Sequence, residues 1–105
     1  RLVMSYTDMD VAAMKGNANE AADLLKVMAH PERLMVLCQL TQGEVGVGEL
    51  QKNSFLSQSA FSQHLTVLRK HKLIKARKAS QQVFYSLSEP RVESLIKALH
   101  SVFCN

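Results

Sequence analysis

Two side chains of the sequence, Cys38 and Cys104, carry thiols, which become strong nucleophiles when they lose their protons. A thiolate attacks a peroxide or a sulfane sulfur, and a second nearby thiol then closes a bridge. Cys38 also shares a predicted helix face with Leu34 and Leu37, where a cysteine serves as a small apolar core residue. From the residues alone, a reactive pair and two unrelated thiols both stay open.

Residues 57–68 form a segment without a single charged side chain. With about 100° per residue, a helix through this segment has one polar arc and one apolar arc. Exposed helix faces are ordinarily rich in Glu and Lys, whereas short hydroxyls and Gln amides hydrogen-bond the edges of bases in the major groove. We therefore predict a helix that reads DNA, with contacts from Ser57, Gln58, Ser59, Ser62, Gln63 and Thr66.

The basic residues are concentrated next to this segment. The chain has a net charge of +4, yet residues 50–88 hold 7 basic groups and no acid, while residues 1–49 hold 4 basic and 7 acidic groups. A solvated surface is one explanation, but a dense basic patch beside an uncharged polar arc separates phosphate contacts from base contacts, as in DNA-binding proteins. We predict further DNA contacts from Arg69, Lys70, Arg77, Lys78, Ser80, Gln81 and Gln82.

Apolar spacing, prolines and capping residues predict the elements that position these groups. The first helix begins within residues 7–10, with acids in its first turn, and ends near residue 29. Further helices follow at residues 31–40, 47–53, 58–71 and 90–103, and strands at 75–78 and 83–87 flank a polar tip at 79–82. The order α-α-α-α-β-β-α is that of a winged helix-turn-helix, which is mainly α with a small β-hairpin.

Length and composition limit the remaining possibilities. A chain of 105 residues with 47% apolar residues forms one domain, here 1–105, with residues 1–7 expected as a flexible lead-in. Two cysteines are too few for a secreted disulfide framework, so we expect a reducing bacterial cytoplasm. The sequence has no apolar run of membrane-spanning length, no glycine-rich phosphate loop and no HExxH, so no membrane, cofactor or enzyme activity is expected.

The first and last predicted helices carry more apolar surface than a monomer needs. A single domain of this size buries too little surface against DNA for tight, specific binding. A two-fold dimer instead reads two half-sites about one helical turn apart. We therefore predict a homodimer through these two helices that binds a palindromic double-stranded operator. The predicted contacts of the last helix are Leu95, Leu99, Val102 and Phe103.

Four stretches of the chain resemble the ArsR family of bacterial winged-helix repressors. They are AHPERL at 29–34, VGEL at 47–50, LSQSAFSQHLTVLR at 56–69 and VFYSL at 83–87, and the resemblance extends over about residues 20–104. It implies a winged-helix fold, operator binding and a homodimer held by the first and last helices.

The best-known members of that family sense metals, but the ligands do not match here. Glycines, Gly46 and Gly48, stand where the third helix of the thiolate sensors carries its two cysteines, so no soft metal is held there. The last helix offers Glu89, Glu93 and His100 at a spacing unlike that of the zinc sensors. We expect caps, packed groups or surface residues rather than ligands at His30, His64, His71 and His100.

The two cysteines resemble a dithiol subgroup of the family that responds to sulfide and oxidants. Leu37-Cys38 and Phe103-Cys104 reproduce its pattern. The resemblance implies that the thiols lie close together in one protomer, that an oxidant, persulfide or polysulfide links them, and that DNA is then released. The predicted function is a repressor switched in this way. The alternatives are an ArsR-type regulator without redox sensing and a metal-responsive repressor with an unrecognised site; a small thiol enzyme ranks last.

Overall fold

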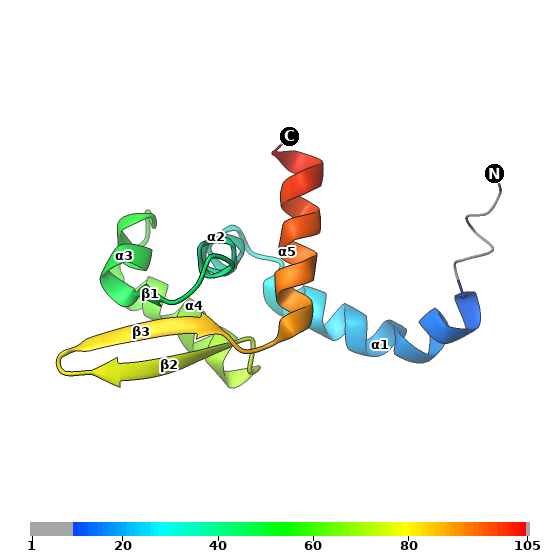
Figure 1. Ribbon diagram of the computed structural model, residues 1–105, viewed down its shortest axis with the longest axis horizontal. Coiled ribbons are helices and arrows are strands. Elements are labelled where there is room, and N and C mark those ends of the chain that lie inside the picture. Colours follow the sequence, from blue (N-terminus) through cyan, green and yellow to red (C-terminus); the bar gives the residue numbers. More distant parts are fainter. Residues whose placement is uncertain (1–9, 105) are drawn as a thin grey trace.

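The computed structural model describes residues 10–104, so the lead-in predicted at residues 1–7 lies outside the described residues. Within this range the chain forms five helices and three strands (Figure 1). The elements in order are α1 (Val11–Met28), α2 (Pro31–Leu40), β1 (Val45–Gly46), α3 (Val47–Lys52), α4 (Gln58–Lys70), β2 (Ile74–Ala79), β3 (Gln82–Leu87) and α5 (Pro90–Phe103). None of these helices is long and apolar enough to cross a bilayer.

Four of the five described helices begin directly after a residue whose side chain caps the first turn. The Asp10 carboxylate accepts a hydrogen bond from the Ala13 amide at 3.0 Å, and the Ser57 hydroxyl accepts one from the Ala60 amide at 3.2 Å. A proline opens both α2 and α5, where its missing N–H costs nothing. The expectation of acids in the first turn of α1 is wrong, because that turn has none and Asp10 stands before the helix as its cap.

The two C-terminal strands form the predicted antiparallel hairpin, which we call the wing. Its turn takes only Ser80 and Gln81, and Ser80 adopts a positive φ of 56°. Beside it lies a strand that the sequence did not predict. β1 pairs antiparallel with β3, with Val45 opposite Tyr85, so the sheet order is β1-β3-β2. A two-residue strand is too short to show a periodic pattern in the sequence. It is recognised only because it pairs with β3.

One apolar core lies between α2, α4, the sheet and the start of α5. The apolar arc of α4 supplies Phe61, Leu65 and Leu68, each at most 3% exposed, so its polar arc must face solvent. Fully burying a side chain of this size stabilises the fold by about 1.5–3 kcal/mol. We call the part from α2 to β3 the head. The other buried core residues are Met28, Val36, Leu37, Leu40, Leu50, Leu73, Ile74, Tyr85, Val92 and Ile96.

Helix α1 and the C-terminal part of α5 extend away from the head, and we call these two helices the arms (Figure 1). Every residue from 11 to 20 of α1 is exposed. At the other end of the chain, Val102 is 71% exposed and Phe103 is 79% exposed. Arg91 joins the two arms through an ion pair with Glu20 at 2.8 Å. Most of the exposed large apolar side chains lie on the arms, although Met35 and Phe55 of the head are exposed as well.

Candidate nucleic-acid interface and thiol site

The polar arc of α4 and its cap form one continuous exposed surface, which we call the reading face. The Ser57 hydroxyl serves as the helix cap, and the Thr66 hydroxyl donates to the Ser62 carbonyl at 2.9 Å. Among residues 10–104, no hydrogen bond engages the side-chain amides of Gln58 or Gln63. These amides can therefore meet an external partner without losing an internal one. The exposed residues of the reading face are Ser57, Gln58, Ser59, Ser62, Gln63 and Thr66.

Behind the reading face, a histidine and an arginine fix α4 to its neighbours. Arg33 Nε donates to His64 Nδ1 at 3.1 Å, and Arg33 Nη1 donates to the Val27 carbonyl at 2.9 Å. The His64 ring lies 4.2 Å from the His30 ring, centroid to centroid. Burial, together with the charges of His30 and Arg33, lowers the pKa of His64, which favours the neutral acceptor. His30 accepts from the Glu32 amide at 3.1 Å, so it is a helix cap, one of the expected roles.

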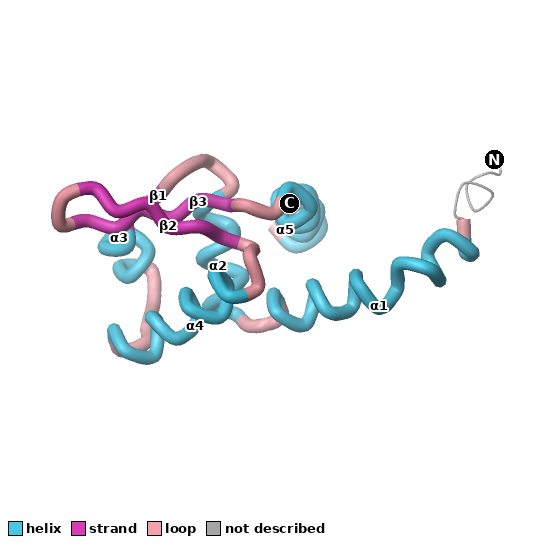
Figure 2. The backbone as a smooth tube through the Cα atoms, turned by 90° about the horizontal axis from the view of Figure 1, so that it is seen from below, coloured by secondary structure: helices cyan, strands magenta, loops and turns pink. Residues whose placement is uncertain are grey.

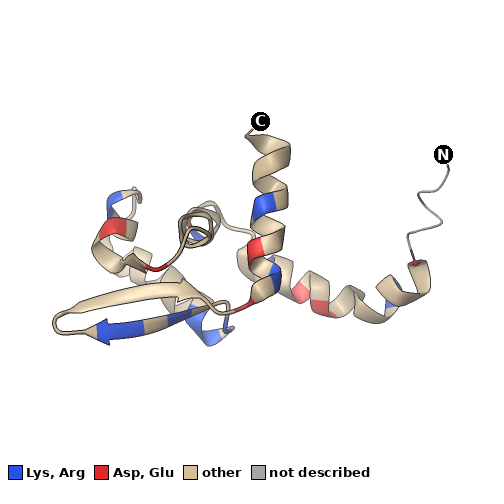
Figure 3. Cartoon of the chain, in the orientation of Figure 1, with Lys and Arg blue, Asp and Glu red and all other residues tan. Residues whose placement is uncertain are grey.

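Basic residues surround this surface. Figure 3 shows Lys and Arg gathered along β2 and at the C-terminal end of α4, while the acids lie mainly on the arms and near α3. Arg69 and Lys70 occupy the last turn of α4, where positive charge also complements the helix dipole. Their side chains are exposed, as are those of Lys78 and of the wing-tip residues Ser80, Gln81 and Gln82.

Arg77 differs from these residues because an acid already binds it. Its Nε and Nη2 donate to the two carboxylate oxygens of Glu44 at 2.9 and 2.7 Å. Its guanidinium carbon also lies 4.9 Å from the centroid of the Phe84 ring. The hydrogen bond from Arg77 holds the pKa of Glu44 below its ordinary value. The sequence did not indicate this role for Glu44, because only the sheet brings it to a residue 33 positions away.

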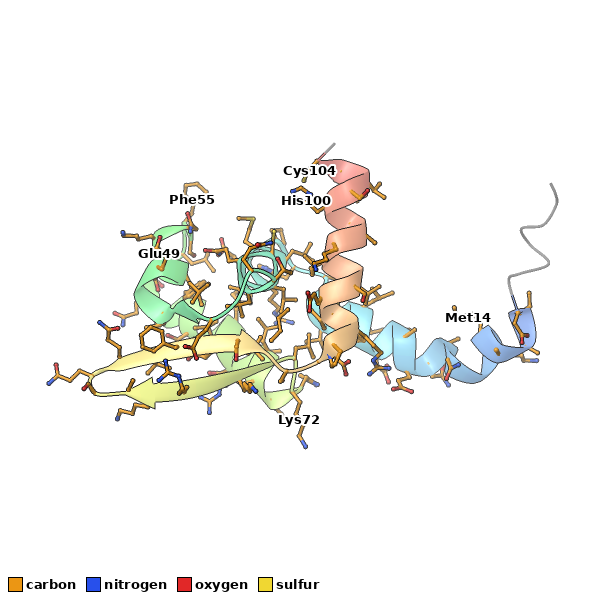
Figure 4. All side chains as sticks on the ribbon, viewed as in Figure 1. Met14, Glu49, Phe55, Lys72, His100 and Cys104 are labelled. Carbon is orange, nitrogen blue, oxygen red and sulfur yellow. The ribbon has the colours of Figure 1, made fainter. Side chains whose placement is uncertain are left out.

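The two cysteines, 66 residues apart in the sequence, line the same groove between α2 and α5. Cys38 is half-buried, Cys104 is exposed, and neither forms a disulfide. Figure 4 shows Cys104 and His100 at the C-terminal end of α5, on the side toward α2. The groove has a volume of about 360 Å³, and its other lining residues are Pro31, Leu34, Met35, Ile96, Leu99, His100 and Phe103. The wall of this groove is mainly apolar, and Cys104 is open to solvent at its end.

The two glycines that stand where thiolate sensors of the family carry cysteines belong to a strand and a helix. Gly46 pairs with β3, and Gly48 lies in α3. Over the described range 10–104, no three His, Cys, Asp or Glu side chains come together in a way that could hold a metal ion.

Comparison with known proteins identifies the family. Residues 30–76, from the cap of α2 into β2, match the profile of the bacterial regulatory protein, arsR family. The transcriptional activator HlyU of Vibrio cholerae is 46% identical over 96 residues, which cover 91% of this chain and 89% of that protein. The chain belongs to the arsR family. A second relative of this arsR-family protein, the biofilm growth-associated repressor of Xylella fastidiosa, is 43% identical over 87% of this chain and 80% of its own length.

Solved structures give the same result for the fold. Reduced HlyU from Vibrio cholerae superposes with a TM-score of 0.82 at 45% identity, covering 90% of this chain and 100% of that one. The transcriptional repressor BigR from Xylella fastidiosa gives a TM-score of 0.81 at 40% identity, covering 97% and 99%. The winged helix-turn-helix fold and the family membership expected from the sequence are therefore confirmed. This arsR-family chain is a DNA-binding transcriptional regulator, and its relatives are regulators rather than enzymes.

Proposed function

We propose that the protein is a dimeric repressor in the bacterial cytoplasm. In this proposal, a covalent bridge between Cys38 and Cys104 lowers its affinity for a palindromic operator. The observation that carries the switch is the shared groove, in which one thiol comes from the head and the other from an arm. The names of the relatives support the regulatory role: one is a transcriptional activator and the other a repressor.

In this proposal the head uses uncharged polar side chains to contact bases and basic side chains to contact phosphates. The Gln amides and the hydroxyls of the reading face bind base edges in the major groove, because they carry both donors and acceptors and no charge. The basic side chains around them neutralise phosphates, which contributes most of the affinity that does not depend on sequence. The phosphate contacts are Arg69, Lys70 and Lys78, with Ser80, Gln81 and Gln82 of the wing tip against the backbone or minor groove.

A second copy of the chain covers the arms. Contiguous exposed apolar surface marks an interaction site, and an isologous pair places the same surface on both partners. A groove of about 450 Å³ between α1 and α5 lies beside Leu24, Leu25 and Leu95, so both arms contribute to one surface. The exposed apolar side chains that a partner would cover are Val11, Met14, Leu25, Leu99, Val102 and Phe103.

The switch is a thiol exchange that consumes an organic trisulfide, R–S–S–S–R. One cysteine thiolate attacks the central sulfur and expels one R–S⁻, leaving a mixed trisulfide, Cys–S–S–S–R, whose first sulfur is that of the cysteine. The second thiolate attacks the same central sulfur and expels the other R–S⁻, so one sulfur atom joins Cys38 to Cys104. Two thiolates are oxidised and one trisulfide is reduced to two thiolates. With hydrogen peroxide, a sulfenic acid forms first and the second thiol displaces its hydroxide to give a plain disulfide.

The bridge acts by favouring one dimer shape. It joins α2, which packs behind the reading helix, to α5, which carries the dimer contacts, and so changes the relative placement of two heads on one duplex. A ligand or bridge shifts such an equilibrium only through its differential effect on the two shapes. If the coupling free energy between the thiol bridge and DNA binding has the usual size, the bridge weakens operator binding by roughly 5- to 150-fold.

The experiment is an anisotropy titration on a duplex selected from a random pool by the reduced protein. We expect glutathione trisulfide to release this duplex, and mass spectrometry to find one added sulfur between Cys38 and Cys104. The Cys104→Ser variant is the matched control, since it keeps the reading face and loses the bridge. If Cys38→Ser responds like the wild type, the protein is a regulator without thiol sensing. If zinc chloride releases the duplex instead, the metal-responsive alternative is correct.

A further inference from the structure

The two faces of the wing differ in what they approach. Side chains alternate along a strand, so Ile74, Ala76 and Lys78 share one face of β2 and Arg77 lies on the other. Ile74 is buried in the core that contains the apolar arc of α4, so its face is the side of the sheet toward α4. Figure 2 shows α3 and α4 on one side of the hairpin. Lys78 therefore lies on the side of the reading helix, and Arg77 lies on the outer side.

On that outer side, three strands contribute to a single contact. Arg77 stands directly opposite Phe84 on β3, and Gly46 of β1 stands opposite Phe84 on its other edge. A Cβ atom at Gly46 would come within 3.4 Å of Phe84 Cε1, so the ring lies over the glycine. The Arg77 guanidinium covers the ring and reaches Glu44, two residues before Gly46. We call Glu44, Phe84 and Arg77 the clasp.

We propose that the clasp positions the wing, and that Arg77 acts through Glu44 instead of contacting a phosphate. Arg77 points away from the reading helix, and its Nε and Nη2 already donate to the two carboxylate oxygens of Glu44. β1 contributes only two residues to the sheet, so little else joins the hairpin to the loop before α3. The clasp crosses β3 and ties β2 to that loop, which fixes the angle at which Lys78 and the tip meet DNA.

This inference rests on the proposed function, because it takes the wing to lie against the duplex. The test measures binding to the selected duplex at several KCl concentrations. Removing one phosphate contact lowers the slope of log affinity against log salt by about 0.9. We expect that loss for Lys78→Ala, and an unchanged slope for Arg77→Ala despite weaker binding. Lys97→Ala, which removes a cation paired to Glu93 on the arm α5, is the control with neither effect.

Exchanging the charges of Arg77 and Glu44 provides a second, independent test. Arg77→Glu puts two carboxylates together and should weaken binding by roughly tenfold or more, whichever role Arg77 has. The double variant Glu44→Arg/Arg77→Glu rebuilds the ion pair in reverse and should restore binding to within about threefold. A phosphate contact at Arg77 would instead leave the double variant as weak as the single one.

Three results would overturn the proposal: a lower salt slope for Arg77→Ala, wild-type affinity for Arg77→Ala, or no rescue by the exchange. Hydrogen exchange of the free protein keeps folding separate from binding. Breaking the clasp should speed exchange of the β3 amides and leave those of α4 protected. If Lys78→Ala leaves the slope unchanged, Lys78 does not neutralise a phosphate and that part of the proposed function fails, while the exchange rates still decide whether the clasp holds the hairpin.

Discussion

The head and the arms differ in how much of their apolar surface is buried. In the head, Leu37, Leu50 and Leu68 have no measurable exposure, and no polar side chain is buried among residues 10–104. On the arms, Val102 is 71% exposed, and Met14, at 53%, projects from the far part of α1 (Figure 4). Six of the eight large apolar side chains exposed among residues 10–104 lie on the arms, and Met35 and Phe55 are the two on the head. A concentration of this kind marks an interaction surface. The head has the core of a self-sufficient unit, and the arms have the surface of an interface.

The largest effect should come from opening the head's core. Leu68→Ala removes a fully buried side chain from α4, and such changes destabilise a protein by about 2–5 kcal/mol through lost burial and a cavity. Urea unfolding followed by circular dichroism measures this loss. The matched change on an arm, Leu99→Ala, should cost less than half as much when both proteins are compared at one concentration. Equal losses would remove the distinction between head and arms.

The next effect concerns assembly rather than folding. Val102→Arg places a charge in the proposed dimer surface, so sedimentation velocity at micromolar concentration should find monomers with a normally folded head. Binding to the selected duplex should fall by at least roughly tenfold, because one head contacts only one half-site. Lys97→Ala, on the opposite side of the same helix, is the control and should remain dimeric. A dimer that survives Val102→Arg would contradict the proposed interface.

The sequence predicted the head better than the contacts that cross it. Caps and prolines are local, so Ser57 alone placed the start of α4, and the periodicity of the next eleven residues separated its two arcs. Pairings between distant segments have no such local mark. The strand β1 and the Glu44–Arg77 ion pair both depend on sheet register, which a two-residue strand cannot reveal. Arg77 therefore looked like its neighbour Lys78 until its partner was known.

The sequence also could not show by itself that the two thiols lie in one groove. The spacing of 66 residues between Cys38 and Cys104 carries no geometric information, and only the resemblance implied that they meet. Folding brings them to one groove because α2 and α5 pack together, with Leu37 and Ile96 in the same core. Helix faces predict which residues turn inward, but not which two inward faces become neighbours.

A smaller effect distinguishes two kinds of exposed side chain on the head, those proposed to contact bases and those proposed to contact phosphates. Gln63→Ala should leave stability and dimerisation unchanged, because no other side chain depends on that amide among residues 10–104. It should cost about 1–3 kcal/mol of discrimination at one base pair and leave the salt slope intact. Lys70→Ala should do the reverse, weakening all duplexes alike and lowering the slope by about 0.9. Competition titrations with single-base variants of the selected duplex measure both. If the two changes behave alike, base and phosphate contacts are not divided as proposed.

The smallest effect lies at the seam between head and arm, where Arg33 bonds both His64 of α4 and the Val27 carbonyl of α1. Burial lowers the pKa of His64 from its ordinary value of 6.5, and the charges of His30 and Arg33 lower it further. The unfolded chain therefore binds this proton more readily than the folded one, so stability is complete above about pH 6.5 and declines as the pH falls from there toward the lowered pKa. Protonation also turns Nδ1 into a donor that faces the Arg33 donor.

The variant His64→Gln tests this seam, because a Gln side chain supplies an acceptor for Arg33 and does not titrate. The free energy of unfolding, measured by urea at intervals between about pH 5 and pH 8, should decline less steeply toward acid in the variant than in the wild type. All other side chains are the same in the two proteins, so the difference between the two profiles reports on the replacement of His64. Parallel profiles would mean that His64 carries its proton equally well folded and unfolded. The seam would then join head and arm by packing alone, without the neutral acceptor that the Arg33 geometry requires.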